Sequence, residues 1–243
     1  MIDWPPASDP LKLQNGSVHV WAVALDDADL DCDRGLTILS SDERGRAAKF
    51  KFERDRRRYV VAHSALHELL AGYLGTNAAN LRFVAGENGK PKLAARFAEG
   101  AIEFNLSHSH ERALVAVALG REVGVDIEFI KVDFAFDEIA GRFFTAKEVN
   151  ALRALPAHLQ RRAFYKCWTS KEAFLKAKGT GLSGKLDEVE ITLAGNELVQ
   201  ITANVPGWSL AELNPGDSYE AAIAIQGERS PVSCYRWRPP ATA

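Results

Sequence analysis

Short apolar runs bounded by turn residues recur along the chain, and they predict β-strands. Between two of these runs, residues 88–91 (Asn-Gly-Lys-Pro) have the composition of a tight turn. The first residues, rich in Pro, Asp and Ser, predict an irregular lead-in. The runs predicted as strands are 18–23, 81–84, 101–104, 112–119, 124–129, 188–193 and 220–226.

Two longer stretches, 54–73 and 159–178, predict α-helices. Before each lies a capping-box pattern, in which a Ser or Thr opens a helix and a Glu follows three residues later. Glycines at the end of each stretch favour the left-handed conformation that stops a helix. The capping pairs are Ser40 with Glu43 and Thr145 with Glu148, and the glycines are Gly72 or Gly75 and then Gly179 and Gly181.

The repetition of this plan predicts a duplicated unit. Setting Tyr59 over Tyr165 places residues 62–66 over residues 168–172, and the glycines then align within one residue. Identity between the two halves is low, so the alternative is two unrelated helices that share common caps. We expect an α+β fold made of two similar tandem units, with residues 1–122 in the first unit and residues 123–243 in the second.

Composition and charge narrow the class of protein. The chain is 47% hydrophobic and 26% charged, which is ordinary for a soluble globular protein, and its net charge of -2 gives no global attraction to nucleic acid. No apolar stretch approaches the roughly 20 residues that span a bilayer. The N-terminus lacks the pattern of a signal peptide, and Cys32, Cys167 and Cys234 show no pairing or zinc spacing. We therefore expect a cytoplasmic protein.

Two carboxylates stand at alternate positions of the strand predicted over 124–129. Asp126 and Glu128 point to the same face of that strand, whereas Val125 and Ile127 point to the other. Adjacent carboxylates repel each other unless a cation lies between them, and carboxylate oxygens suit Mg²⁺ bound together with substrate phosphates. The alternative is an exposed polar face of the strand.

The second predicted helix places charge beside an apolar surface. At 100° per residue Lys171 falls inside an apolar arc, and Glu172 and Lys176 lie at its edge. A buried lysine is costly unless it is paired, although its ammonium group could also reach the surface. Glu172 and Lys176 could equally form a simple i,i+4 surface pair. In the aligned first half the positions of Lys171 and Glu172 hold Ala65 and Leu66, and this asymmetry favours a functional site.

Two further segments carry polar chemistry. Residues 105–110 (Asn-Leu-Ser-His-Ser-His) are predicted as a turn between two strands, where hydroxyl and backbone donors suit phosphate; the alternative is a polar hairpin loop. A serine hydrolase is disfavoured because the G-x-S-x-G elbow is missing. The basic stretch 44–58 includes Phe50 and Phe52. It can be a solvated helix face or a landing site for phosphates and an acidic partner, while nucleic-acid motifs are absent from it.

Four motifs in order resemble the 4'-phosphopantetheinyl transferase superfamily. They are Gly89-Lys90-Pro91, Asn105-Leu106-Ser107-His108-Ser109, Gly124-Val125-Asp126-Ile127-Glu128, and the helix pattern from Trp168 to Gly181. The resemblance covers about residues 44–189, and the chain length fits the long, two-unit form of the family. This form implies a pseudo-twofold dimer of units within one chain, usually a monomer, with the active site between the halves.

The resemblance also implies an activity, a metal and a set of catalytic residues. The expected reaction transfers the 4'-phosphopantetheine moiety of coenzyme A to a serine of an apo acyl or peptidyl carrier protein with an acidic surface. Asp126, Glu128 and Glu172 would hold Mg²⁺, and the base would be Glu172 or Glu148. A coenzyme A-binding protein without transfer activity and a nucleotide hydrolase remain alternatives.

Coenzyme A contacts follow from the same resemblance, position by position. Lys171 and Lys176 would meet the phosphates, and Lys176 counts among the catalytic residues. His108, with Ser107, would meet the 3'-phosphate or the pyrophosphate. The remaining contacts expected are Arg58 at the 3'-phosphate, Lys90 near the adenine, and Arg46 and Lys49 in place of the family's basic residues upstream of Arg58.

Overall fold

The structure is a computed structural model of the chain. It describes residues 3–7, 12–86, 89–95, 97, 101–180, 186, 189–194 and 200–239. Asn88, Gly181 and Glu188, which the sequence analysis placed in a turn, at a helix end and in a strand, lie outside the described residues. None of the helices in the described part of the chain is both long and apolar enough to cross a membrane.

The first half of the chain runs from a strand through a group of helices into further strands. Its elements are β1 (Val18–Ala24), α1 (Cys32–Ile38), α2 (Ser41–Ala47), α3 (Glu53–Leu74), the 3-10 turn η1 (Ala78–Asn80), β2 (Phe83–Ala85), β3 (Pro91–Leu93), β4 (Ile102–Ser109) and β5 (Arg112–Leu119). Strand β5 pairs in antiparallel fashion with both β1 and β4, and β2 pairs with β3. Strands predicted over 81–84 and 101–104 are present as β2 and β4, and β3 between them is a strand that the sequence analysis did not predict.

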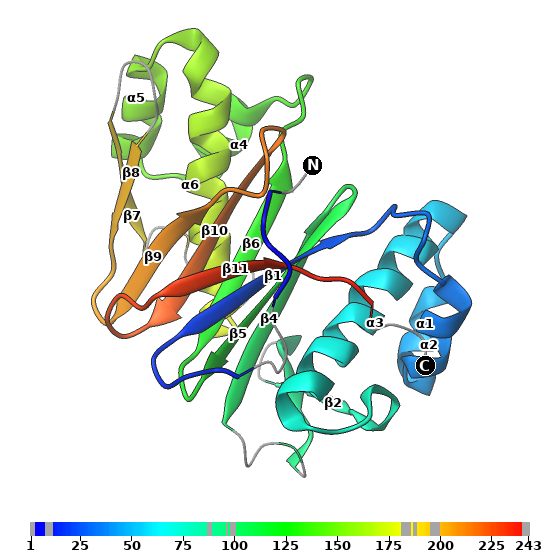
Figure 1. The fold of residues 1–243 in the computed structure, drawn as a ribbon. Helices are drawn as coiled ribbons and strands as arrows, with labels where there is room; N and C mark the ends of the chain where they lie inside the picture. Colours follow the sequence, from blue (N-terminus) through cyan, green and yellow to red (C-terminus); the bar gives the residue numbers. More distant parts are fainter. Residues whose placement is uncertain are drawn as a thin grey trace.

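The second half repeats this order of elements. It consists of β6 (Val123–Phe129), α4 (Phe136–Phe143), α5 (Ala146–Ala154), α6 (Ala157–Lys178), β7 (Glu190–Ala194), β8 (Gln200–Asn204), β9 (Trp208–Leu213), β10 (Tyr219–Gln226) and β11 (Val232–Arg236). Strand β10 pairs with β6 and β9 just as β5 pairs with β1 and β4, and β7 pairs with β8. The duplicated α+β plan is therefore confirmed. Strand β11, however, joins the first sheet beside β1 (Figure 1).

The two sheets lie between two groups of helices, α1–α3 on one side and α4–α6 on the other (Figure 1). Alternate residues of β5 explain the layers: Leu114 and Ala116 enter the core between the sheets, whereas Val115 and Val117 enter the core beneath α3. The second sheet packs on α6 in the same way, and Ala222 and Ala224 of β10 lie in that core.

Helix ends follow the sequence signals closely. Ser40 and Thr145 each cap a helix in a complete capping box. Helices α3 and α6 end at Gly75 and Gly179, both with left-handed backbone angles. Because the caps and stops are local, short-range chemistry is enough to predict them.

Small polar side chains of β4 join the two sheets. Asn105 Oδ1 accepts a hydrogen bond from the backbone N–H of Val125 at 2.9 Å, and Ser109 Oγ accepts one from Phe129 at 3.0 Å. Ser107 Oγ lies 3.4 Å from the Ile127 backbone nitrogen. The expectation that residues 105–110 form a turn is wrong, because strand β4 extends to Ser109. These side-chain acceptors thus bind backbone N–H groups at the open edge of β6, which a neighbouring strand would otherwise bind.

Each half also buries the glutamate of its capping box. Glu43 accepts hydrogen bonds from Ser40 and lies 3.1 Å from His67 Nε2, while His67 Nδ1 lies 3.0 Å from the carbonyl oxygen of Ala78. Glu148 instead forms a 2.8 Å ion pair with Lys171, and both side chains are fully buried. The two halves thus tie the short helix to the long one with different side chains, His67 in the first half and Lys171 in the second.

The Glu43 cluster should make stability depend on pH. Burial alone raises the pKa of Glu43, but hydrogen bonds from His63, His67 and Ser40 outweigh it and hold the pKa below its ordinary value of 4.5. A lowered pKa in the folded state stabilises the protein above the unfolded value, and this stability is lost as the pH falls. We expect Glu43→Gln to cost about 2 kcal/mol at pH 7 and progressively less below about pH 4.5.

Urea unfolding of both proteins between pH 7 and pH 4 measures this difference. Glu138→Gln, which removes an exposed carboxyl of α4, serves as the control and should change little at any pH. A Glu43→Gln deficit of the same size at every pH would contradict the assignment of the lowered pKa to this cluster.

Candidate active site

Three carboxylates gather where strand β6 crosses helix α6. Asp126 and Glu128 lie on β6, and Glu172 lies on α6. The crossing is close because Gly124 has no side chain: a Cβ atom there would stand 2.1 Å from the Ala173 carbonyl oxygen and 2.3 Å from the Ala177 nitrogen. Glycine at this position therefore brings the helix carboxylate to the strand carboxylates.

Asp126 is buried and only partly satisfied. Its Oδ1 accepts hydrogen bonds from Ser107 at 2.9 Å and from Lys176 Nζ at 2.5 Å, whereas its Oδ2 has no partner. Burial raises the pKa of Asp126, although Lys176 and Ser107 act against this. The site thus keeps one carboxylate oxygen free of protein partners.

Burial and neighbouring carboxylates also raise the pKa values of Glu128 and Glu172. Burial and the charge of Asp126 raise the pKa of Glu128, against a 2.8 Å hydrogen bond from Ser109. Burial, Asp126 and Glu128 raise the pKa of Glu172 to about 7, and Lys176 only partly offsets this. Glu172 Oε1 is buried without a hydrogen-bond partner. Such mutual repulsion costs folding free energy, and a bound cation would relieve it.

The donor set fits a hard divalent cation, although no finished metal centre is present. Among the described residues, no three His, Cys, Asp or Glu side chains are placed so that they could hold a metal ion together. The unpartnered oxygens of Asp126 and Glu172 are nevertheless the ligand type that Mg²⁺ prefers. The ligand type therefore suits a divalent cation, whereas the present positions of the three carboxylates do not form a binding site for one.

Several basic side chains lie near one another around His108, and one of them, Lys176, contacts Asp126. His108 of β4 is accessible, yet enough protein surrounds its ring that burial lowers its pKa, and the positive charges of His63, Lys176 and Arg58 lower it further. Arg58 of α3 is mostly buried and pairs with Asp26 through both carboxylate oxygens, with 2.7 Å from Nε to Oδ1. Basic groups from both halves of the chain, Arg58 in the first and Lys176 in the second, thus act on His108.

Three of the residues singled out by sequence lie apart from the carboxylates. Lys171 is fully buried on α6, where it binds Glu148 and the carbonyl oxygens of Leu186 and Val189 at 2.8 and 2.5 Å. Glu148 also accepts the backbone N–H of Ile191 at 2.8 Å. The structure does not bring either side chain to Asp126.

The ammonium group of Lys90 is likewise hydrogen-bonded to other groups of the protein. Its Nζ donates to Glu122 at 2.6 Å and to the carbonyl oxygen of Ala177 at 2.8 Å, and it lies 3.3 Å from the carbonyl oxygen of Val123. It therefore fastens the end of α6 to the start of β6. Arg46 and Lys49, by contrast, are exposed at the end of α2. Phe50 and Phe52 nearby are also exposed, so this basic surface is open to a partner.

Some site residues escaped the sequence analysis. Ser109 holds Glu128, Asp26 holds Arg58, and His63 lies within the electrostatic reach of His108. For Ser109 the signal was available, because Asn105, Ser107 and Ser109 alternate with the period of a strand. The contacts of Asp26 and His63 are long-range, and nothing in the local sequence marks them.

Two cavities help to place the site. An apolar cavity of 290 Å³ opens directly beside Glu128. The aromatic and aliphatic residues that line it include Phe129, Phe134, Ile139, Phe143, Phe164 and Trp168. A larger cavity of 760 Å³ lies elsewhere, between the start of β1, β11 and the loop before β11.

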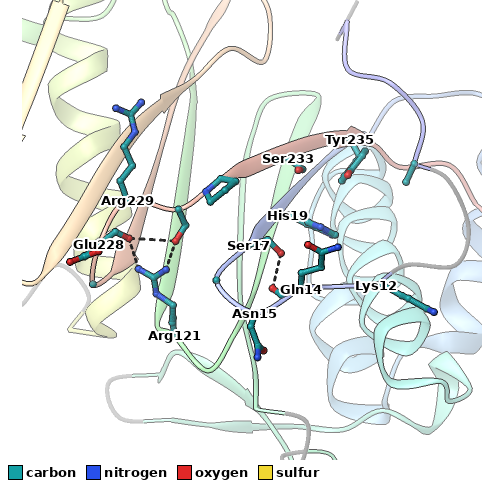
Figure 2. Close-up of a pocket in the computed structure, with 15 residues that line it drawn as sticks. Lys12, Gln14, Asn15, Ser17, His19, Arg121, Glu228, Arg229, Ser233 and Tyr235 are labelled. Atoms are coloured by element: carbon teal, nitrogen blue, oxygen red, sulfur yellow. Dashed lines mark hydrogen bonds between the residues drawn. The ribbon is translucent and has the colours of Figure 1, made fainter.

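The larger cavity lacks a converging set of reactive groups. In it Arg121 is bound to the backbone of Gln226 and Glu228 and to Ser230. Figure 2 shows Lys12 and Arg229 on opposite sides of this space. The carboxylate site, with the apolar cavity beside Glu128 and Lys176 bound to Asp126, is therefore the better candidate for chemistry.

Comparisons with known proteins identify the family of the chain. Residues 122–224 match the model of the 4'-phosphopantetheinyl transferase superfamily, and residues 29–120 match the model of the 4'-phosphopantetheinyl transferase N-terminal region. The chain is 39% identical to the 4'-phosphopantetheinyl transferase HetI of Nostoc sp. (strain PCC 7120), over 97% of this chain and 96% of that protein. It is 29% identical to the 4'-phosphopantetheinyl transferase Sfp of Bacillus subtilis, over 70% and 73% of the two chains.

Among solved structures, the holo-[acyl-carrier-protein] synthase of Thermotoga maritima matches 44% of this chain and 64% of that chain, at 20% identity and a TM-score of 0.35. That structural likeness is too weak to establish a family. The sequence matches do establish the family, because they extend over both halves and one covers nearly the whole chain. The chain therefore belongs to the 4'-phosphopantetheinyl transferase superfamily and is a transferase.

Proposed function

We propose that the chain transfers the 4'-phosphopantetheine arm of coenzyme A to a serine of an apo acyl or peptidyl carrier protein. The observation that carries this proposal is the cluster of three mutually repelling carboxylates with Lys176 bound to one of them and further basic groups around His108. The basic groups suit the phosphates of a nucleotide, and the carboxylates suit the cation that accompanies them. The family membership supports the reaction type.

We further propose that Asp126, Glu128 and Glu172 hold Mg²⁺. The unpartnered oxygens of Asp126 and Glu172 and the raised pKa values of all three carboxyl groups support this set. When bound, the ion would neutralise charge on the pyrophosphate of coenzyme A. Lys176, hydrogen-bonded to Asp126 and partly exposed, would add a fixed positive charge beside the same phosphates.

The chemical step is a phosphoryl transfer. The serine oxygen of the carrier forms a bond to the phosphorus that bears the pantetheine arm, and the bond from that phosphorus to the bridging oxygen breaks. Adenosine 3',5'-bisphosphate leaves with the bonding electrons. Glu172 is the better base for the serine proton, since its Oε1 has no protein hydrogen-bond partner. Glu148 is enclosed in its ion pair with Lys171.

The surroundings of the carboxylates accommodate the rest of the substrates. The apolar cavity beside Glu128 is placed to receive the pantetheine arm, and Trp168 forms part of its wall. His108 and Arg58 would meet phosphate groups at the other side. We propose that the enzyme acts as a monomer in the cytoplasm, where its three free cysteines would stay reduced.

Mass spectrometry of the carrier protein tests the proposal. The protein, coenzyme A and Mg²⁺ are incubated with a panel of apo carrier proteins, and each carrier is then weighed. A gain of one phosphopantetheine supports transfer. Release of phosphate with no gain on any carrier would favour a nucleotide hydrolase, and binding of coenzyme A with neither product would leave a binding protein.

The exposed basic end of α2 should matter for the carrier. We expect Arg46→Glu with Lys49→Glu to raise the KM for an acidic carrier about tenfold at low salt, with little change in kcat. The reason is loss of electrostatic attraction at an exposed surface, so the effect should shrink as salt rises. Steady-state kinetics at two ionic strengths measure it, and a salt-independent change would point to a direct role in catalysis.

A further inference from the structure

The 760 Å³ cavity beside β1 and β11 contains a histidine that the proposed function does not use. His19 of β1 lines this cavity, whereas Asp126, Glu128 and Glu172 do not, so the cavity is separate from the carboxylate site. Only 8% of His19 is exposed. Small molecules commonly bind in cavities of about 300–1,000 Å³ that carry a few polar groups on their walls. A buried histidine at the wall of such a cavity is therefore a candidate contact for a ligand.

Hydrogen bonds fix the tautomer of His19. Trp21 Nε1 donates to the hydroxyl oxygen of Tyr73 at 2.9 Å, and the same hydroxyl group lies 2.7 Å from His19 Nδ1. Burial raises the pKa of Tyr73, so the hydroxyl keeps its hydrogen, and among the described residues only His19 Nδ1 is placed to accept it. Burial also lowers the pKa of His19, which favours the neutral ring. The hydrogen of that ring therefore lies on Nε2.

The Nε2–H group of His19 is left for an acceptor from outside the protein. None of the hydrogen bonds among the described residues uses this nitrogen. The ring of Tyr235 lies 5.3 Å from that of His19, with 77° between the planes, and Tyr235 lines the same cavity. Its hydroxyl group also takes part in none of the described hydrogen bonds. One wall of the cavity thus offers an imidazole N–H and a phenol O–H to a ligand.

The charged groups of the cavity favour an anion at this wall. Figure 2 shows Lys12 and Gln14 at the end of the cavity that holds His19. The carboxylate of Glu228 and the guanidinium of Arg121, which is bound to the protein, lie at the other end. A single ammonium group among neutral N–H and O–H donors suits a singly charged carboxylate, whereas a phosphate dianion is more often held by arginine or by several cations.

We propose that this cavity binds a small organic monocarboxylate. His19 Nε2 and the Tyr235 hydroxyl donate hydrogen bonds to the carboxylate oxygens, and Lys12 supplies the positive charge. Tyr73 is the positioning residue, because a His19 ring with its hydrogen on Nδ1 would present a lone pair at Nε2 and repel a carboxylate. The inference does not rest on the proposed function, since it concerns binding in a separate cavity and none of the residues assigned to transfer.

NMR with benzoate as the probe tests the site. The full-length protein, labelled with ¹⁵N in its histidine rings, is titrated with sodium benzoate at neutral pH and constant ionic strength. Before benzoate is added, the spectrum should show a neutral His19 ring with its hydrogen on Nε2. We expect the Nε2–H signal to shift saturably, with a Kd on the order of 1 mM for so small a ligand.

Three variants separate a built site from weak surface binding. Tyr235→Phe, which removes only the hydroxyl group, should raise the Kd for benzoate about tenfold. Lys12→Met should raise it about threefold at low salt and less at high salt, because Lys12 is exposed. Lys147→Met, which removes an exposed lysine of α5, is the control and should leave the Kd unchanged.

Three results would overturn the inference. The first is a His19 ring with its hydrogen on Nδ1, or one that carries both hydrogens at neutral pH. The second is a benzoate titration that does not saturate, or a folded Tyr235→Phe protein with the wild-type Kd. The third comes from inorganic phosphate as a second probe: if phosphate shifts the same signal at lower concentration than benzoate, the cavity is not a monocarboxylate site.

Discussion

Replacing Asp126 with Asn should lower phosphopantetheine transfer at least about a thousandfold while the protein stays folded. The substitution keeps the shape of the side chain and an acceptor for Ser107 and Lys176, which now bind Oδ1. It removes the negative charge and the unpartnered Oδ2 that the proposed cation site requires. Asp126→Ala should have the same effect on activity.

Stability should not fall with activity in the Asn variant. Because the folded protein raises the pKa of Asp126, the ionised carboxylate costs stability at neutral pH, and its removal should leave the free energy of unfolding unchanged or higher. Asp133→Asn, which changes an exposed aspartate in the loop after β6, is the control and should keep full activity. A folded Asp126→Asn protein with wild-type transfer activity would contradict the assignment of Asp126 as a metal ligand.

Local patterns were sufficient to predict the carboxylate pair and the helix ends. Asp126 and Glu128 share a face for no reason beyond the period of a strand, and capping boxes and terminal glycines act within one helical turn. The duplicated plan could also be predicted, since the caps and stops recur at matching positions in both halves. These predictions needed no knowledge of which elements touch.

Long-range partners could not be predicted in this way. The 105–109 segment has the period of a strand but the composition of a turn. Its small polar side chains are explained by hydrogen bonds to the backbone of β6, a strand distant in sequence. The joining of β11 to β1 brings together residues at opposite ends of the chain. The sequence also gives only a weak helix signal over α1, because this helix packs through Gly35, where a Cβ atom would stand 3.0 Å from Val60.

Lys171 illustrates both what the sequence can predict and what it cannot. Its place in an apolar arc left two possibilities, a buried and paired lysine or one that reaches the surface. The structure shows the first, with Glu148 and two backbone carbonyls as partners that the sequence does not identify. The asymmetry between the halves therefore favours a functional site when only the sequence is considered. The structure offers a structural explanation instead, since the first half meets the same need with Glu43 and His67.

Replacing Lys171 with Met should accordingly destabilise the protein by about 3–5 kcal/mol, because Glu148 would remain buried without its cation. The double variant Lys171→Met with Glu148→Gln should recover much of that loss, since the glutamine side chain would be neutral and its carbonyl oxygen could still accept the Ile191 N–H. Lys147→Met breaks an exposed pair with Glu190 and should leave the free energy of unfolding nearly unchanged. Urea unfolding of the wild type and the three variants measures these differences.

Activity of the double variant decides what Lys171 does. If the pair is structural, the folded double variant should transfer phosphopantetheine at close to the wild-type rate per folded molecule, with an unchanged KM for coenzyme A. If Lys171 leaves its carbonyl partners to contact a coenzyme A phosphate, as the family resemblance implies, the double variant should fold and yet show a raised KM or a lost kcat. The present contacts favour the first outcome, because an ammonium group with three protein acceptors and no exposed surface would have to break all three interactions to reach the substrate.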